Sequence, residues 1–458
     1  MTQVAEEKDI LVSTYAQMRE TLDTPSTPWL DELRRAGMAH FEKVGFPSGR
    51  EEAWRFTNVA PIARTKFTPG LGTITPVARD VAKQYSFGDK AAIELVFING
   101  HFARELSKLD RLPGEAHVGT LADAFDADDQ TVRNNIGRLV KLDTTPFTAL
   151  NAGFVFDGAF IRLPRNTTIP APIHLLFVST AGADGQPTVC HPRVLILAED
   201  NVEAAIVESY VGPEGAVYWT NAVTEVAIGK DSRIDHNKLQ QESLRAFHTA
   251  AMHVHLDRGS YFISHNTTIG GRITRNDPSV KMAGEGAYAV LNGLVILDGE
   301  QHCDNHTLLD HFSPNCPSHE LYKHVLDGKS SAVFKGQIYV HPEAQKTDSK
   351  QTSKSLLLSD SAEINSMPAL EIYADDVKCT HGSTVGPVDQ DMLFYLRSRG
   401  VGIDAAKHLL TYAFVADVTR RITVEPVRAR IEDFMAAQHG LPQDLRITDL
   451  SDFDAEVL

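Results

Sequence analysis

Three stretches of the chain, DSRIDHNKLQ at 231–240, GSYFISHNTT at 259–268 and GAYAVLNGLV at 286–295, decide the fold. Each stretch begins with an acidic or glycine turn and a small residue, and then alternates between apolar and polar residues. This alternation is typical of β-strands, because successive side chains of a strand point to opposite faces. The same texture continues from about 155 to 378 without a convincing helix, so the sequence predicts a mainly β protein.

The turns recur at a nearly constant interval. The small residue lies near positions 204, 232, 260, 287, 331 and 362, which gives spacings of 28, 28, 27, 44 and 31. A near-constant period predicts stacked structural repeats, and the spacing of 44 predicts an insertion in one repeat. A propeller blade needs about 40–50 residues, whereas 28 residues suffice for a coil of two or three short strands. We therefore predict a right-handed parallel β-helix over 93–378, with a β-sandwich of coincidental spacing as the alternative.

Helical regions are predicted on both sides of this core, over 1–92 and 379–458. In the first region Thr27 is a candidate N-cap, and Pro28 occupies the first helical position, where its missing N–H costs nothing. In the second region three helices are expected, and Asp404 is the candidate N-cap of the middle one. The acid-rich tail from Ile431 onward is expected to be solvated.

The composition excludes several classes of protein. The 458 residues include 44 Lys+Arg and 60 Asp+Glu, a formal charge of −16, which excludes nucleic acid and anionic membranes as general partners. Four widely spaced cysteines (Cys190, Cys303, Cys316 and Cys379) are too few for a disulfide scaffold or a conventional four-cysteine cluster within one chain. The first twenty residues do not form a secretory signal and no long apolar run follows, so a cytoplasmic location is expected.

The densest group of candidate metal ligands lies at 302–324, the segment that we identify with the predicted insertion. Cys303 and His306 are three residues apart, as are Cys316 and His319, and this local spacing occurs in zinc and iron sites. The alternative is that they are ordinary strand residues, because histidine is frequent throughout this part of the chain. We expect no stable metal site in the isolated chain and keep these four residues as secondary candidates.

Two kinds of enzyme have weak support in the sequence. The G-K-S at 328–330 matches the end of a P-loop, but the glycine required five residues earlier is Lys323, so nucleotide hydrolysis is not predicted. Glycosidases need two carboxyl groups that face one bond, whereas the adjacent acids at 375–376 would point to opposite faces of a strand. A metal-dependent or carbohydrate-active β-helix enzyme that uses the 302–324 segment remains the alternative function.

The stretch with the most specific chemistry is ADDVKCTHGSTVG at 374–386. Cys379 and His381 are two residues apart and therefore project from the same side of an extended strand. A thiolate and an imidazole together are suitable ligands for iron. A structural turn with a buried cysteine is the alternative interpretation.

The same stretch, together with FYLRSRG at 394–400, resembles the SufB/SufD family of iron–sulfur cluster assembly proteins. SAVFKGQIYV at 331–340 and AQKTDSKQTSKSLLLS at 344–359 are similar to the core of that family. EEAWRFTN at 51–58 is similar to the SufD members rather than to the SufB members. The resemblance is strong over about 300–421 and looser over the preceding β region.

The resemblance implies a non-catalytic scaffold subunit of a SufBCD-type complex. It implies that the chain pairs with a SufB-like paralogue through the β-helices and docks a SufC-like ATPase on the C-terminal helical domain. It also implies a transient iron–sulfur cluster in the complex and no cofactor in the isolated chain; a flavin in the complex is left open. A purified chain is expected to form a homodimer, because an open β-helix edge can pair with a copy of itself.

Site residues follow from the resemblance position by position. His381 matches the histidine that SufD members bring to the cluster-assembly interface, and Cys379 matches the family cysteine beside it. The helices around 389–421 match the SufC-docking region. Four aromatic and arginine residues in that region either contact SufC or pack the domain, namely Phe394, Tyr395, Arg397 and Arg399.

Overall fold

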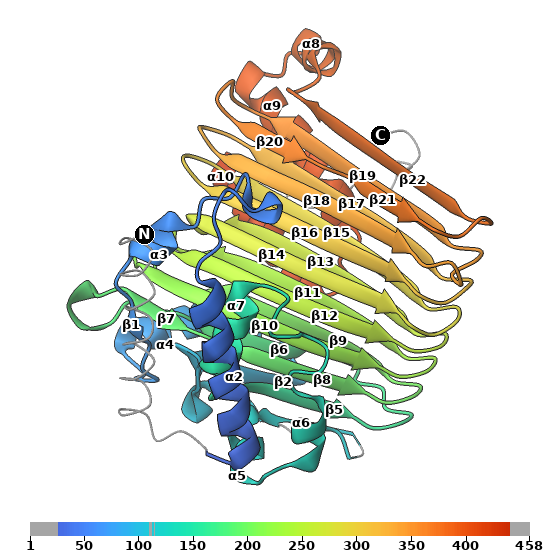
Figure 1. Cartoon of the computed structure of the whole chain (residues 1–458). Coiled ribbons are helices and arrows are strands. Elements are labelled where there is room, and N and C mark those ends of the chain that lie inside the picture. Colours follow the sequence, from blue (N-terminus) through green and yellow to red (C-terminus); the bar gives the residue numbers. More distant parts are fainter. Residues whose placement is uncertain (1–25, 110–111, 114, 440–458) are drawn as a thin grey trace.

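Two sheets of stacked parallel strands form the centre of the molecule, as the computed structural model of residues 26–109, 112–113 and 115–439 shows (Figure 1). The first sheet contains β4 (His117–Thr120), β5 (Gly158–Leu163), β8 (Arg193–Ala198), β10 (Tyr218–Ile228), β12 (Phe247–Leu256), β14 (Ile273–Met282), β16 (His302–His311), β18 (Ser331–Val340), β20 (Glu363–Ser366) and β21 (Ala369–Ile372), with β1 (Thr68–Pro69) and β7 (Thr188–Cys190) at its side. The second sheet contains β3 (His101–Phe102), β2 (Ile93–Ile98), β6 (Ile173–Val178), β9 (Glu203–Val211), β11 (Arg233–Glu242), β13 (Tyr261–Gly270), β15 (Tyr288–Leu297), β17 (Pro317–Leu326), β19 (Asp348–Leu357) and β22 (Lys378–Gly386).

The chain alternates between the two sheets, one strand in each per coil. Arg233 of β11 pairs with Glu203 in the coil before and with Tyr261 in the coil after, so equivalent positions lie directly above one another. In β18 the residues at alternate positions are buried, and they point into the space between the sheets. The predicted mainly β architecture, a parallel β-helix with helical segments at both ends, is confirmed.

The insertion predicted from the spacing of 44 is wrong. After Tyr288 begins β15 in the second sheet, the next strand of that sheet begins at Pro317 without extra residues. Ser331, by contrast, begins β18 in the first sheet, where it pairs with His302. The spacing of 44 was therefore measured from one sheet to the other, and the 302–324 segment is part of two regular coils.

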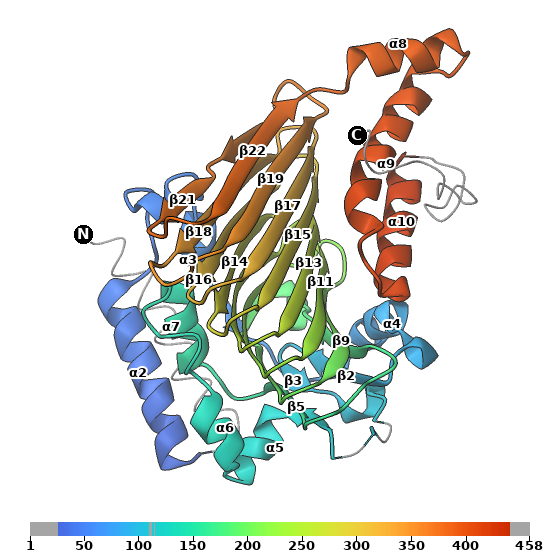
Figure 2. The same ribbon diagram turned by 90° about the vertical axis from the view of Figure 1, so that its right-hand side faces the viewer.

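The N-terminal helices cover the first coils, most of them on the side of the first sheet, whereas the helix at 76–85 lies against β6 and β9 of the second sheet (Figure 2). They are α2 (Pro28–Val44), α3 (Ala60–Arg64), α4 (Pro76–Tyr85), α5 (Leu121–Asp126), α6 (Gln130–Asn135) and α7 (Pro146–Gly153). Thr27 is the N-cap of α2, as predicted, although its side chain makes no capping hydrogen bond. Gly37 lets α2 approach α7 closely, since a Cβ there would lie 2.6 Å from the Ala149 carbonyl oxygen. The helices α5–α7 fall inside the segment 93–378 that we assigned to the core.

Three C-terminal helices follow the last strand. They are α8 (Gln390–Ser398), α9 (Ile403–Thr419) and α10 (Glu425–His439). The predicted N-cap Asp404 is wrong by two residues, because Gly402 is the N-cap of α9 and Asp404 lies in its first turn. Figure 2 shows α9 and α10 along the outer face of the second sheet, with α8 beyond its last strand. The expectation of a solvated tail from Ile431 onward is wrong for the part up to residue 439, because this part belongs to α10 and buries Ile431 and Met435; the rest of the tail lies outside the described residues.

The two sequence motifs that gave weak support to an enzyme both lie in turns. The G-K-S at 328–330 connects β17 to β18, and Gly328 adopts a positive φ of 61° there. The acids at 375–376 lie between β21 and β22, and Asp376 forms an ion pair with Lys346. Within the described ranges, no helix is both long and apolar enough to span a membrane.

Candidate functional site

The last strand of the second sheet, β22, carries Cys379 and His381. It pairs with β19 on one side, and its other edge has no strand partner among the described residues. Cys379 is in register with Ser349, and His381 with Gln351. Ser349 and Gln351 are buried in the interior, and Cys379 packs against the main core. Cys379 and His381 therefore continue the interior residues of β19 at the C-terminal end of the solenoid, which we call the open end.

Cys379 is half-buried and His381 is exposed at the rim. Burial raises the pKa of the Cys379 thiol; a hydrogen bond with the Ser349 backbone lowers it, and the Asp348 carboxylate raises it again, for a net increase. The thiol therefore carries its proton at neutral pH, and a bound metal or a cationic group is needed to form the thiolate. Two ligands on one strand are also too few to hold a metal centre without groups from elsewhere.

The open end exposes backbone and apolar side chains together. The last elements of the first sheet are β20 and β21, and within the described part of the chain they pair with β18 alone (Figure 1). β22 has the same position in the second sheet. Three large side chains at this end are exposed, namely Ile372 (37%), Tyr373 (57%) and Val385 (50%). Unpaired strands flanked by apolar groups are a surface that another chain can extend.

The four residues predicted for SufC docking lie on or directly after α8. The helix turns Leu393 toward the protein, whereas Phe394 and Tyr395 are 73% and 53% exposed. Arg397 and Arg399 are also exposed, and the Arg399 guanidinium lies 5.1 Å from the centroid of the Tyr395 ring. Their exposure shows that these side chains contribute little to the packing of the helices, which was the other role considered for them.

The structure does not bring the secondary metal candidates together. Cys303 points into the interior from β16, whereas His306, three residues later, is on the outer face and contacts Asp304 at 3.0 Å. Cys316 lies in the turn before β17, and His319 packs edge-on against a tyrosine ring of the second sheet. Among the described residues no group of three or more His, Cys, Asp and Glu has an arrangement that could hold a metal ion.

The sequence did not predict a cluster of side chains that binds the EEAWRFTN segment to the first sheet. Arg275 of β14 donates to the Ala53 carbonyl oxygen at 2.9 Å, and its guanidinium lies 4.4 Å from the centroid of the Trp54 ring. Arg275 also contacts Asp304 at 2.5 Å, and the Thr57 hydroxyl donates to the same carboxylate. Burial alone would raise the pKa of Asp304, but the opposing effects, led by Arg275, lower it to about 2. We name these residues (Ala53, Trp54, Thr57, Arg275 and Asp304) the N-terminal clasp.

A second missed feature is a buried carboxyl group behind the open end. Gln351 of β19 donates from Nε2 to Glu320 Oε2 of β17 at 2.6 Å. Both side chains are 2% exposed. Burial raises the pKa of Glu320 to about 7. Glu320 lies in the 302–324 segment, for which the sequence predicts an insertion, and no local pattern indicates that its carboxyl group is buried.

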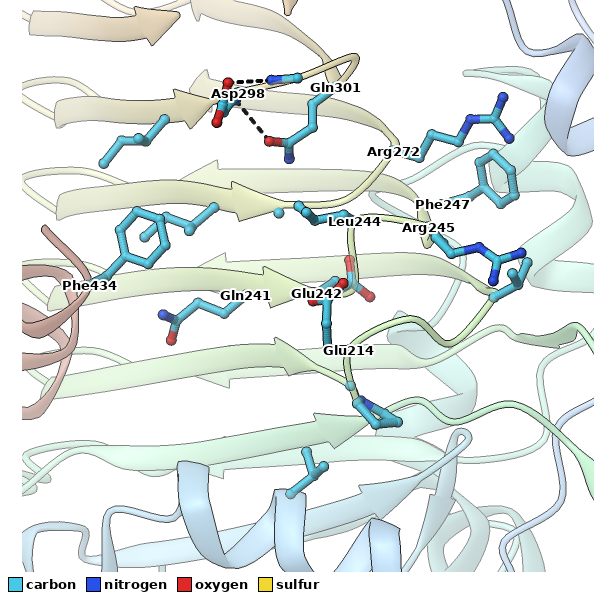
Figure 3. A pocket seen from close by; sticks show the side chains of 18 of the residues that line it. Glu214, Gln241, Glu242, Leu244, Arg245, Phe247, Arg272, Asp298, Gln301 and Phe434 are labelled. Atoms are coloured by element: carbon cyan, nitrogen blue, oxygen red, sulfur yellow. Dashed lines mark hydrogen bonds between the residues drawn. The ribbon is translucent and has the colours of Figure 1, made fainter. Parts of the chain in front are cut away.

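A pocket of about 1000 Å³ lies along the corners of the coils, between the sheets and the helices α4 and α10. Figure 3 shows Glu214, Gln241 and Glu242 near its centre, with the side chains of Arg245 and Arg272 pointing to one side of it. Because acidic and basic groups line it together, its walls do not select one ligand charge. The sequence did not predict this pocket, since its residues come from turns that are distant along the chain.

Comparisons with known proteins agree with the architecture. The family model described as the SufBD core domain of SUF-system FeS cluster assembly matches residues 177–414, and the model of the SufBD protein N-terminal region matches residues 5–175. An iron–sulfur cluster assembly SufBD family protein of Synechocystis is 30% identical over 401 residues, which cover 86% of this chain and 87% of that protein. The iron–sulfur cluster assembly protein SufD of Escherichia coli is 29% identical over 389 residues, covering 85% of this chain and 88% of that protein.

The protein named SufD in Bacillus subtilis is 26% identical over 426 residues, covering 88% of this chain and 92% of that protein. These matches span both helical ends and the solenoid, and they confirm the resemblance drawn from the motifs at 374–386 and 394–400. The chain therefore belongs to the SufBD family, resembles its SufD members, and has a role in iron–sulfur cluster assembly.

Proposed function

We propose that this chain is a non-catalytic scaffold subunit of a SufBCD-type complex. Its open end pairs with a SufB-like paralogue, and its C-terminal helices dock a SufC-like ATPase. The observation that carries this proposal is the position of Cys379 and His381 on β22, the end strand of the second sheet, whose outer edge has no strand partner among the described residues. A scaffold of this kind acts in the cytoplasm.

The cluster is the cargo of the site and not a resident cofactor. Cys379 can supply a thiolate and His381 an imidazole, both of which ligate iron. A second subunit that adds strands to the open end would bring its own ligands to the same place, and this supports a shared site. A flavin bound by the complex would be a further component of the assembly.

Docking of the ATPase is supported by the surface of α8. Phe394 and Tyr395 project from this helix with arginines beside them, and exposed aromatic and arginine side chains are typical of the energetic centre of an interface. The chain has no P-loop of its own, so the energy of ATP hydrolysis would come from the partner. Movement of the docked subunit would then strain the pairing at the open end.

His381→Ala tests the ligand role. We expect the variant to fold and to bind both partners normally, because the exposed imidazole contributes no packing. It should nevertheless lose most cluster formation, because one ligand is missing. The measurement is the activity of iron–sulfur enzymes in cells that depend on this assembly system, with co-purification of the partners as the check on complex formation. His117→Ala, an exposed histidine at the other end of the solenoid, is the matched control. Full activity with His381→Ala would exclude the ligand role.

A further inference from the structure

A lysine is buried in the middle of the solenoid. Lys238 of β11 is 9% exposed, and its side chain points into the space between the two sheets. Burial lowers the pKa of Lys238, and the carboxylates of Glu208 and Glu242 partly reverse this effect, so that the pKa is about 8. The amine is therefore protonated at neutral pH and has three N–H groups to donate.

One of these N–H groups has a direct partner in the chain. Lys238 Nζ donates to Asn276 Oδ1 of β14 at 2.5 Å, across the interior. The ammonium also lies over the Tyr210 ring, with Nζ 5.3 Å from the ring centroid, but a ring face is a weak acceptor. No other oxygen of the described residues accepts a hydrogen bond from Lys238. Because buried donors are nearly always hydrogen-bonded, at least one N–H group requires a partner from outside the chain.

The interior also contains an acceptor without a donor. Asn266 of β13 is 8% exposed, and its Nδ2 donates to Asn305 Oδ1 at 3.4 Å. Its Oδ1, by contrast, has no partner in the described part of the chain. Exchange of the two amide atoms would not help, because the Asn266 oxygen would then face the oxygen of Asn305. A donor is therefore needed beside Asn266 Oδ1.

The two unpaired groups are the ends of one network. Asn276 Nδ2 donates to Asn305 Oδ1 at 3.0 Å, which is the oxygen that Asn266 also contacts. Lys238, Asn276, Asn305 and Asn266 therefore form a chain of hydrogen bonds that begins at the ammonium and ends at the unpaired amide. Lys238 and Asn266 are in register on neighbouring strands, about 4.8 Å apart, so the two ends lie close together. One group that accepts from Lys238 and donates to Asn266 would close a ring.

Space for such a group is present. Lys238 and Asn266 line the same cavity, which has a volume of about 30 Å³. A water molecule needs about 10–15 Å³ and two to four polar partners. An anion would meet the Glu208 carboxyl group and the Asn266 oxygen, which are both acceptors, and a metal ion would meet the Lys238 ammonium. Water can accept from the ammonium and donate to the amide oxygen, so it matches both ends of the chain.

We propose that this cavity binds one ordered water molecule, which accepts a hydrogen bond from Lys238 Nζ and donates one to Asn266 Oδ1. The ring that it closes takes Lys238 and Asn266 from the second sheet, and Asn276 and Asn305 from the first. The water therefore joins the two sheets across the interior and completes the hydrogen bonding of a buried cation. This site is separate from the open end and does not depend on the proposed function.

A crystal structure of the unchanged full chain, at a resolution that shows ordered water, tests the site. We expect one density peak within about 3 Å of both Lys238 Nζ and Asn266 Oδ1. Lys238→Met keeps the length of the side chain but removes the donor, and the peak should disappear. In solution, magnetic relaxation dispersion of the solvent counts long-lived buried water and should find one molecule fewer in Lys238→Met.

Thr268→Val is the matched control. It removes a buried hydroxyl group from the same strand as Asn266, but Thr268 does not line the cavity, so the peak should remain. Asn266→Leu removes the acceptor at nearly the same volume, and it replaces Lys238→Met if that variant does not fold. A cavity without density in the unchanged chain would overturn the inference, as would a peak that remains in Lys238→Met or Asn266→Leu. Loss of the peak in Thr268→Val would show that it depends on general packing and not on the two partners.

Discussion

The burial of the Glu320 carboxyl group makes the stability of the folded chain depend on pH. Its pKa is about 7 in the folded chain against an ordinary value of 4.5, so the folded state binds this proton more tightly than the unfolded state. The stabilising effect of the neutral acid is therefore complete below pH 4.5 and is lost as the pH rises through 7. Glu320→Gln removes this dependence, because the amide remains neutral at every pH.

We expect the free energy of unfolding of Glu320→Gln, relative to the unchanged chain, to rise by up to about 3 kcal/mol between pH 4.5 and pH 7.5. Urea denaturation at several pH values measures this difference, and all other titrating groups cancel in the comparison. Glu363→Gln should give a flat difference, since its side chain is exposed. A flat difference for Glu320→Gln as well would show that the carboxyl group is solvated.

At the scale of single elements, the N-terminal clasp makes a testable claim about buried charge. Arg275 and Asp304 have side chains that are 3% and 1% exposed. Arg275→Met keeps the length of the side chain but leaves the Asp304 carboxylate without its main counter-charge. Loss of one member of a buried ion pair costs about 3–5 kcal/mol at neutral pH, and we expect unfolding by urea to show a loss of this size.

Arg258→Met is the matched control for this prediction. Arg258 pairs with Asp231 at 3.0 Å, but both side chains are more than half exposed, so its loss should leave the stability nearly unchanged. Equal losses for the two variants would mean that the clasp contributes only as much as a surface ion pair. The fluorescence of Trp54, which lies under the Arg275 guanidinium, should change only in Arg275→Met.

The strands could be predicted from the sequence because their period is local. Alternation of apolar and polar residues at 231–240 and at equivalent stretches predicts each strand, and the recurrence of these stretches predicts the next coil. The same alternation shows why Cys303 and His306 cannot share a face: three residues apart on one strand is an odd number of steps. That spacing indicates a ligand pattern only in an irregular insertion, whereas the segment forms two regular strands.

Contacts between distant segments could not be predicted in this way. Thr57 and Asp304 are 247 residues apart along the chain, and no local pattern indicates that they meet. The burial of Glu320 could not be predicted for the same reason. Its neighbours in the interior come from successive coils, and the strand register brings them together. Cys379 and His381 were recognised because both lie in one short motif and two positions apart on one strand.

The two ends of the whole molecule differ, and this asymmetry determines how it can associate. At the N-terminal end the sheets finish in antiparallel strands, since β3 pairs with β2 and β4 pairs with β5. At the C-terminal end the parallel strands β20, β21 and β22 have no further strand partner among the described residues, and Tyr373 and Val385 are exposed beside them. The end that carries His381 therefore offers parallel strand edges to another chain.

We expect the purified chain to form a homodimer through this end in the absence of another partner, because a two-fold axis lets each open edge pair with its copy. Charges on an edge strand oppose such pairing, so the double variant Tyr373→Lys/Val385→Lys should be a monomer at micromolar concentration by sedimentation velocity. Leu244→Lys, which charges a residue that is 54% exposed on a turn far from the edge, should remain a dimer. A double variant that still dimerises would place the contact elsewhere, and a monomeric unchanged chain would show that the open end requires a partner of different sequence.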